Sequence, residues 1–327
     1  MLRSFVLTVG CLAGLCSLGI AAEGESAIVL VRSARSGAWS NEATWEGGKV
    51  PGHGTKVQVR PGHVVTYDVQ APESLVIRSL FVAGTVTFST DKSTQLNVGL
   101  IKVEASNSTE EEGFDCDMHL ETPAPDRPKA TLLVGTALQP VAANARAIIR
   151  LTYVPGMNQE SCPAIVCCGG RMEFHGAALN RTWVKLGAHA DLGTKEVTLA
   201  EPVSGWKVGD RTLVTATQSG YRKADTTESR IISAIDPSGT KLSFDEPLEH
   251  KHLGEGEFRG EVANLSRNVV VESADPDGVR GHTMYHRHSA GSIGYAEFRH
   301  LGKKGVLGRY SLHFHLVGST MRGSSVI

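Results

Sequence analysis

The chain has 327 residues, a formal net charge of −1 and 41% hydrophobic residues. This length suits one large all-β domain or two smaller ones with a sizeable core. The near-neutral charge argues against a nucleic-acid partner, so any preference for anions must come from a local part of the surface.

The first residues are typical of a secretory signal peptide. Met-Leu-Arg is followed by an apolar run from Phe5 to Ile20 and then by Ala21 and Ala22, which gives a basic start, an apolar stretch and small residues at a cleavage site. Cleavage near Ala22 leaves a mature chain that begins at Glu23 and is secreted, periplasmic or bound at the cell surface. The apolar run is short for a membrane span of about 20 residues, so we expect no membrane span in the mature chain.

Strand patterns follow in chain order, many of them only three or four residues long. The first group lies at Ala27–Arg32, Lys56–Arg60, Val64–Asp68, Leu75–Ile77, Leu80–Ala83, Val86–Phe88, Leu96–Val98 and Ile101–Val103. The second lies at Thr131–Val134, Ile148–Thr152, Arg171–His175, Trp183–Leu186, Lys195–Leu199, Arg211–Ala216, Arg230–Asp236, Lys241–Phe244, Asn268–Glu272, Thr283–His288, Ile293–Phe298 and Tyr310–Val317. Such rungs bury a core only when they are stacked, so we predict an all-β fold, either a β-helix or a β-roll, with one short helix within Gln139–Arg150.

Two features lie outside this pattern. The segment Asn107–Pro128 is acidic and proline-rich, which indicates a surface excursion whose Asp115 and Asp117 either ligate calcium or are simply solvated. The mature chain also has four cysteines, and in an oxidising compartment we expect a disulfide. It would join one cysteine of the adjacent pair to one of the other two, the four being Cys116, Cys162, Cys167 and Cys168.

Histidine and positive charge are concentrated at the end of the chain. Six of the 13 histidines lie between His282 and Ile327, and residues 281–327 carry a net charge of +5. A local basic field concentrates anionic ligands even on a nearly neutral molecule. In the strand pattern 312–316 the alternation places Leu312, Phe314 and Leu316 toward the core and His313 and His315 outward.

The preceding strand pattern repeats this arrangement. His286 and His288 share one face, and Tyr285 and Arg287 share the other. Stacked rungs would then form a patch of imidazole, guanidinium and phenol groups that binds a divalent metal. The same patch could instead supply an acid, a base and a carboxylate clamp for cleaving a uronate-containing chain. A solvated histidine pair is the remaining alternative, and Glu297 is the only acid nearby in the sequence.

Several motifs resemble a known extracellular family. Similarity to the G-eight domain, a β-rich extracellular module, is carried by Ser36-Gly37-Ala38-Trp39-Ser40, Ala43-Thr44-Trp45, Gly47-Gly48-Lys49-Val50-Pro51, Arg171-Met172-Glu173-Phe174-His175-Gly176, Thr182-Trp183-Val184-Lys185-Leu186 and Trp206-Lys207-Val208-Gly209-Asp210. Similarity to the cell-surface and cell-migration-inducing hyaluronidases is carried by residues 261–268 and 305–316, with Ser311 standing where the family has proline. Fibrocystin, a receptor-like protein, also resembles this module.

The resemblance implies a G-eight module that leads into a right-handed parallel β-helix. We expect a signal peptide at 1–22, the G-eight domain at 23–220, and the start of the β-helix at 221–327, incomplete at its C-terminus because the last residues look like another rung. The implied activity is binding or depolymerisation of hyaluronan or another acidic polysaccharide, with a divalent metal such as calcium or zinc. A non-catalytic glycan-binding module and a purely structural extracellular domain remain alternatives.

Site residues follow from the enzyme hypothesis. His313, His315 and His300 would act as acid/base groups with Tyr310 assisting, and His313 and His315 could also ligate a metal. The substrate carboxylates would be bound by Arg299, Arg309 and Arg287.

Overall fold

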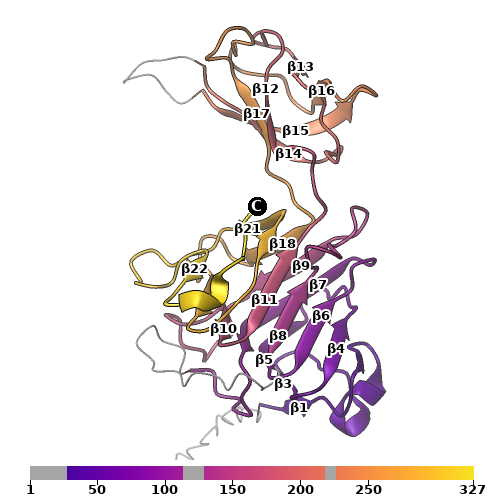
Figure 1. Cartoon of the computed structure of the whole chain (residues 1–327), viewed down its shortest axis with the longest axis vertical. Helices are drawn as coiled ribbons and strands as arrows, with labels where there is room; N and C mark the ends of the chain where they lie inside the picture. The colour runs from indigo at the N-terminus through magenta and orange to yellow at the C-terminus, as the bar shows by residue number, and fades with distance from the viewer. Residues whose placement is uncertain (1–27, 113–128, 218–225) are drawn as a thin grey trace, which may run out of the picture.

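The structure is a computed structural model that describes residues 28–112, 129–217 and 226–327. In these ranges the strands form two parallel sheets and one antiparallel sheet (Figure 1). The helical segments described are short 3-10 turns at η1 (Glu42–Thr44), η2 (Glu46–Gly48) and η3 (Gly318–Met321). Among these residues no helix is long and apolar enough to cross a membrane. The all-β prediction is confirmed.

The parallel strands stack as successive coils of a β-helix-like body. One face of the stack contains β1 (Leu30–Arg32), β3 (Lys56–Val59), β5 (Val76–Val82), β7 (Thr94–Val103), β10 (Ala164–Cys168), β19 (His282–His286) and β22 (His313–Phe314). A second face contains β2 (Gly37–Ala38), β4 (Val64–Tyr67), β6 (Thr85–Phe88), β8 (Thr131–Val134), β11 (Arg171–His175) and β20 (Ile293–Gly294). A third branch adds β9 (Ala147–Leu151), β18 (Val269–Ser273) and β21 (Ala296–Arg299).

The long strand β7 joins the first face to the third branch. Its residues 94–98 pair with β9, and its residues 100–103 pair with β10. Gly99 lies between these halves, where an added Cβ would lie 2.6 Å from the carbonyl oxygen of Arg78. A residue without a Cβ is therefore needed at the corner where the strand changes from one face to the other.

The interior of the stack is apolar and is closed near its first coil by aromatic rings. Trp39 packs edge-on against Trp45 and Tyr67, with ring centroids 4.8 and 5.1 Å apart. Trp45 is fully buried, and its Nε1 donates a 2.7 Å hydrogen bond to the carbonyl oxygen of Trp39. Burial of large aromatic surfaces with the indole N–H satisfied stabilises this end of the core.

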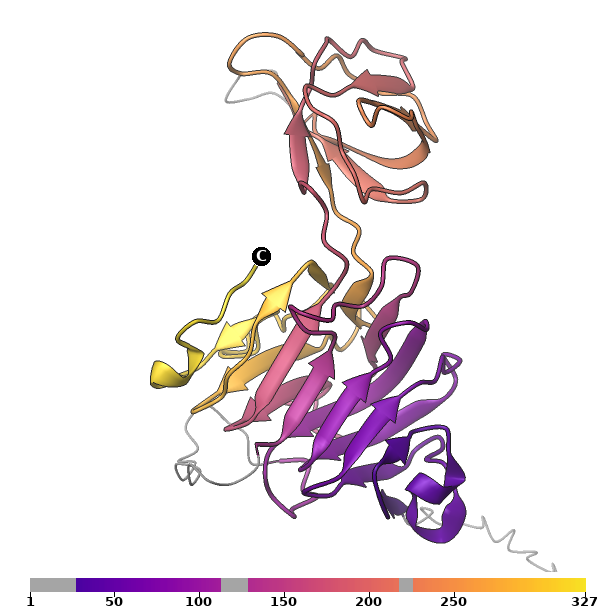
Figure 2. The ribbon, with the colours of Figure 1, turned by 45° about the vertical axis from the view of Figure 1, so that its right-hand side comes forward.

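The antiparallel sheet is inserted between β11 and β18. Its order is β12 (Trp183–Lys185), β17 (Glu261–Asn264), β14 (Arg211–Val214), β15 (Glu228–Ile235), β16 (Lys241–Phe244) and β13 (Glu196–Thr198). It has a separate apolar core that includes Leu186, Trp206 and Phe244. Two chain segments connect it to the parallel stack (Figure 2).

This insertion changes the domain organisation that the sequence predicts. The expected boundary at residue 220 falls within 218–225, outside the described residues, but β14 and β15 on either side of it pair in one sheet. Parallel coils precede and follow that sheet, so the β-helix-like part starts long before residue 221. The physical reason is that β11 and β20 pair directly although residues 176–292 separate them, a contact that no local pattern encodes.

Two local predictions are also wrong. No helix forms within Gln139–Arg150, because Ala147, Ile149 and Leu151 alternate inward in β9. The sequence pattern also misses β10, whose residues are all buried and so give no alternation. The signal-peptide prediction and the possible calcium ligands Asp115 and Asp117 lie outside the described residues.

Candidate functional site

A group of histidines lies on the outward-facing side of the last two coils, where some of the rings are covered and others are exposed. Along β19 the side chains of His282, Met284 and His286 share one face, while Tyr285 enters the core. Met284 is paired with His313 of β22, and paired residues of parallel strands lie side by side on the same face. The register therefore brings His313 and His315 beside the histidines of β19. We call His282, His286, His313, His315 and Tyr310 the histidine patch.

Four of the five rings of the patch are in contact, those of His286, His315, His313 and Tyr310. Those of His286 and His315 are stacked, with centroids 5.4 Å apart and an interplanar angle of 4°. His313 packs edge-on against His315 at 5.1 Å and against Tyr310 at 5.0 Å. His286 is fully buried, whereas Tyr310 is 47% exposed. The patch thus has a buried base and an accessible outer edge.

The hydrogen bond of His313 fixes its tautomer in the neutral state. Its Nδ1 lies 2.9 Å from the carbonyl oxygen of Gly308. A carbonyl oxygen only accepts hydrogen bonds, so Nδ1 carries the proton and donates it. The lone pair of the neutral ring is then on Nε2, which can accept a proton from a bound ligand or water.

His282 is a buried and neutral member of the patch. Burial lowers the pKa of its imidazole to about 3, and the positive charges of Arg309 and Lys303 act in the same direction. Neither ring nitrogen has a hydrogen-bond partner within the part of the chain that the structure describes. His282 therefore packs as a neutral ring at the buried base of the patch and adds no positive charge to it.

A cleft with three cations and two acids lies next to the patch, because the N–H of Lys303 in its lining donates a 2.8 Å hydrogen bond to the carbonyl oxygen of Arg309, the residue before Tyr310. It has a volume of about 540 Å³ and is lined by residues that include Arg280, Lys303 and Lys304, together with Glu160 and Asp277. We call it the lysine cleft.

Lys303 of the cleft is anchored to the segment before β10. Its Nζ donates a 2.7 Å hydrogen bond to the carbonyl oxygen of Cys162. Burial lowers the pKa of Lys303 to about 8, so the ammonium form still predominates at neutral pH. The cleft therefore presents a positive charge that is partly removed from water, where its attraction for an anion is stronger.

The residues predicted from the sequence divide into two groups. His313, His315 and Tyr310 lie together in the histidine patch, and Arg309 is buried beside it, with its Nε 3.2 Å from the carbonyl oxygen of Glu160. Arg299 lies on β21 instead, where its Nε donates a 2.7 Å hydrogen bond to Glu272.

The other two predicted residues are not part of the patch. Arg287 and His288 follow the end of β19 at His286, and His288 has a positive φ of 58°, so it does not continue the alternation. His300 is exposed and has a φ of 56°.

Leu316 is 62% exposed at a φ of 49°, so its predicted core position is wrong. At β19 and β22 the strand ends before the predicted alternation does, whereas His300 follows the end of β21 at Arg299.

The sequence prediction places His286 in the patch of stacked rungs without giving it a role of its own, and it names neither His282 nor Lys303 as a site residue. The spacing of His282 and His286 around Met284 is an available signal, because residues two and four apart share a strand face. No local signal places Lys303 there, since its contact with Cys162 joins residues 141 positions apart.

The patch does not offer a complete metal site. No group of three or more His, Cys, Asp or Glu side chains suited to a metal ion occurs among residues 28–112, 129–217 and 226–327. Zinc takes about four ligands and calcium takes 6–8 oxygens, so the two imidazoles of His313 and His315 do not fit either ion by themselves. No chemical step is therefore assigned to a metal.

The described cysteines are buried thiols. Cys162, Cys167 and Cys168 are free, and Cys116 lies outside the described residues. Cys167 packs in the main core, while Cys162 and Cys168 pack in a smaller apolar cluster with Met284. Burial raises the pKa of Cys162 to about 11 and that of Cys167 to about 12, so both thiols are protonated and unreactive at neutral pH.

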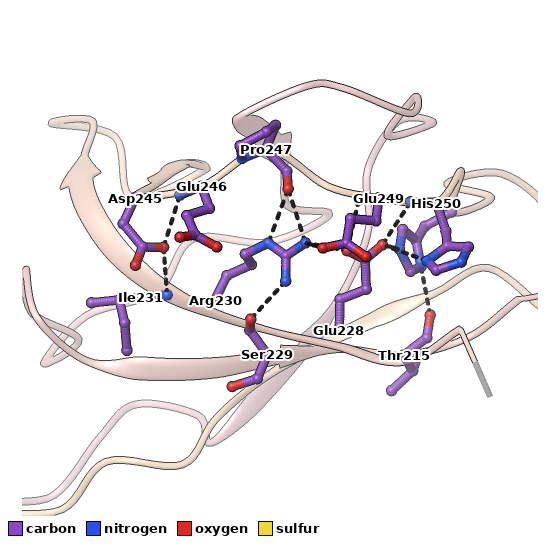
Figure 3. Close-up of polar contacts among 11 residues, drawn as sticks. Thr215, Glu228, Ser229, Arg230, Ile231, Asp245, Glu246, Pro247, Glu249 and His250 are labelled. Carbon is purple, nitrogen blue, oxygen red and sulfur yellow. Dashed lines mark hydrogen bonds and ion pairs between the residues drawn. The ribbon is translucent and has the colours of Figure 1, made fainter.

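A second polar cluster lies in the antiparallel domain. Its centre is Glu228, which accepts hydrogen bonds from the backbone N–H groups of Glu249 and His250 and lies 2.9 Å from His252 Nε2. Arg230 pairs with Glu228 and donates to the carbonyl oxygen of Pro247 (Figure 3).

This network is well satisfied and largely enclosed. The side chain of Glu228 is only 5% exposed. Burial opposes its ionisation, but the hydrogen bonds from Glu249 N–H and His252 and the charge of Arg230 outweigh it and lower the pKa of Glu228. These contacts hold residues 247–252 against β15, which is a structural role.

The comparisons with known proteins agree with the first part of the fold. Residues 44–187 match the G8 (G-eight) domain, and this range contains the coils from β3 to β11 and strand β12. Residues 44–187 of the chain are therefore similar to a G8 domain. The histidine patch lies after the matched residues.

Individual relatives are much longer than this chain. It is 31% identical over 163 residues to Communication mutant protein F of Dictyostelium discoideum, which covers 49% of this chain and 14% of that protein. It is 24% identical over 345 residues to human fibrocystin-L, which covers 88% of this chain and 8% of that protein. The chain thus spans a small part of the length of these relatives.

Proposed function

We propose that this chain is an extracellular, hyaluronidase-like protein that binds a uronate-containing polysaccharide at the histidine patch and depolymerises it. The observation that carries the proposal is the contact of His313, His315 and Tyr310 at the exposed edge of the patch beside the lysine cleft. The G8 domain supports the extracellular setting, because G8 proteins are of the extracellular or cell-surface type.

The chemistry follows from the positions of the groups. Lys303, Lys304 and Arg280 provide cations that can hold uronate carboxylates in the lysine cleft. In an elimination, His313 Nε2 takes the proton from C5 of the uronate and Tyr310 donates its hydroxyl proton to the leaving O4, so the C4–O4 bond breaks and a C4–C5 double bond forms. In a hydrolysis, the same base takes a proton from the attacking water, and Tyr310 again protonates the leaving oxygen. A base and a donor of this kind cleave a uronate chain without the paired carboxylates of most glycoside hydrolases.

The test is incubation of purified protein with high-molecular-weight hyaluronan and other uronate polymers, followed by size-exclusion chromatography. We expect shorter chains with the native protein and intact polymer with the double variant His313→Ala, His315→Ala. His189→Ala is the control, because His189 lies in the antiparallel domain, where its Nδ1 contacts the N–H of Gly254. Cleavage that persists in the double variant would refute the assignment.

Two further arms resolve the chemistry. Unsaturated uronate products, detected by ultraviolet absorbance, would identify elimination, and saturated reducing ends would identify hydrolysis. Calcium, zinc and chelator conditions test the divalent-ion requirement that the family resemblance implies, since cleavage that chelator stops would require ligands beyond His313 and His315.

A non-catalytic glycan-binding module is the second candidate. The basic lining of the lysine cleft favours it, because binding a polyanion requires only the cations and not the acid/base pair. Intact polymer that elutes together with the native protein, and separately from a Lys303→Ala, Lys304→Ala variant, would support this function.

A further inference from the structure

A second cleft lies at the junction between the parallel stack and the antiparallel domain. Its volume is about 500 Å³, and its lining comes from both parts and from both connecting segments, 177–179 and 266–268. We call it the junction cleft. Pockets of this size are typical of small-ligand sites, which occur preferentially where domains meet.

The lining of the junction cleft has an excess of positive charge. Its two acids are Asp210 and Glu297, and its five cations are Arg146, Lys207, Arg211, Arg267 and Arg299. The formal charge of the lining is therefore +3, although the whole chain has a charge of −1. No aromatic side chain is among the described residues that line it, which disfavours a flat, stacked ligand.

Arg299 is paired with Glu272, which lies outside the lining, and the two acids of the cleft leave part of the remaining positive charge unbalanced. Asp210 is engaged locally, because it accepts a 2.8 Å hydrogen bond from the N–H of Lys207 and a 2.7 Å bond from Asn264. Glu297 contacts Arg211 at 3.5 Å and Arg299 at 3.7 Å, which are ion pairs too long for good hydrogen bonds.

Two arginines have no carboxylate partner of this kind. Neither Arg146 nor Arg267 forms an ion pair within the described part of the chain. The guanidinium of Arg267 contacts the carbonyl oxygens of Asn264 and Ser266 through one nitrogen, and burial lowers its pKa. The charges of Glu297 and Asp210 act on Arg267 from beyond ion-pair distance and do not offset the cost of its burial, so an anionic ligand would relieve the remainder.

We propose that the junction cleft binds a sugar acid of monosaccharide to disaccharide size, with the carboxylate of the ligand held by Arg146 and Arg267. Polar groups around them, such as Asn144 and Ser266, suit the hydroxyls of such a ligand. The site is separate from the histidine patch and does not depend on the proposed depolymerisation. Because its lining includes both connecting segments, a bound ligand would also restrain the antiparallel domain relative to the stack.

The test is isothermal titration of the whole chain with D-glucuronate, with D-glucose as the neutral probe and sodium sulfate as the inorganic oxyanion. We expect binding of glucuronate but not glucose, and about tenfold weaker binding in Arg146→Gln and in Arg267→Gln, as expected for the loss of one charge-assisted contact. Equal affinity for sulfate and glucuronate would overturn the sugar-acid assignment, and no binding of glucuronate would overturn the site.

A gain-of-affinity variant separates binding from folding defects. Glu297→Gln keeps the shape of the side chain but raises the formal charge of the lining from +3 to +4, so glucuronate should bind about threefold more tightly or better. Unchanged or weaker binding in this variant would refute the charge argument.

The variant His313→Ala, His315→Ala distinguishes the two sites. We expect it to bind glucuronate as tightly as the native chain does, whatever its effect on polymer cleavage. Loss of glucuronate binding in that variant would show that the two sites are not independent and would overturn the proposal.

Discussion

Because His282 is buried and neutral, the folding stability of the protein should fall with pH already near pH 6.5. This is above the pH range in which carboxylates titrate. Its pKa is about 3 in the fold and about 6.5 in an unfolded chain. The unfolded state therefore binds more protons between these values, and folding stability falls as pH falls below 6.5. Between pH 7 and pH 5 the loss from this one group is about 2 kcal/mol.

The perturbation that tests this is His282→Leu. Leucine is similar in size, has no titratable group and suits a ring whose nitrogens make no hydrogen bonds to described residues. The difference in unfolding free energy between pH 7 and pH 5 should be smaller in the variant than in the native chain by about 2 kcal/mol. Glu111, Glu228 and Glu272 have lowered pKa values, so they contribute stability that is lost only at more acidic pH.

The assay is guanidinium chloride unfolding at pH 7, 6 and 5, followed by circular dichroism, with hydrogen exchange identifying the transition of the parallel stack. His300→Asn is the control, because His300 is exposed and Asn tolerates its φ of 56°. Parallel pH curves for the native chain and His282→Leu would refute the reasoning, since they would mean that His282 binds a proton equally in both states.

Two other predictions concern the fold. Glu228→Gln should destabilise the antiparallel domain by about 3 kcal/mol, because it leaves the buried Arg230 without its nearest carboxylate. Thermal unfolding checks this against Glu246→Gln, on an exposed residue just after β16, and equal effects would contradict it. Gly84→Ala should destabilise the stack by about 2 kcal/mol or more, because the added Cβ would lie 2.2 Å from the carbonyl oxygen of Arg60. Gly52→Ala, with nothing within 4 Å of its Cβ, is the matched control, and similar melting temperatures for both variants would exclude the predicted clash.

The sequence by itself determined the all-β class and most of the strands. Thr131–Val134, Arg171–His175 and Lys241–Phe244 are strands with the bounds that the pattern predicts. It also determined that His313 faces the same side of the sheet as His315. These features depend on alternation and turn residues within a few positions, so they can be recognised without knowledge of distant parts of the chain.

Only the tertiary structure decided which coils are neighbours and which side chains meet. The stack of His286 on His315, the contact of Lys303 with Cys162 and the approach of Arg211 to Glu297 join residues from different coils or domains. The junction cleft exists because β11 and β20 pair across an inserted sheet. Register between coils and the closure of long insertions are set by packing of the whole core, and a local pattern does not contain that information.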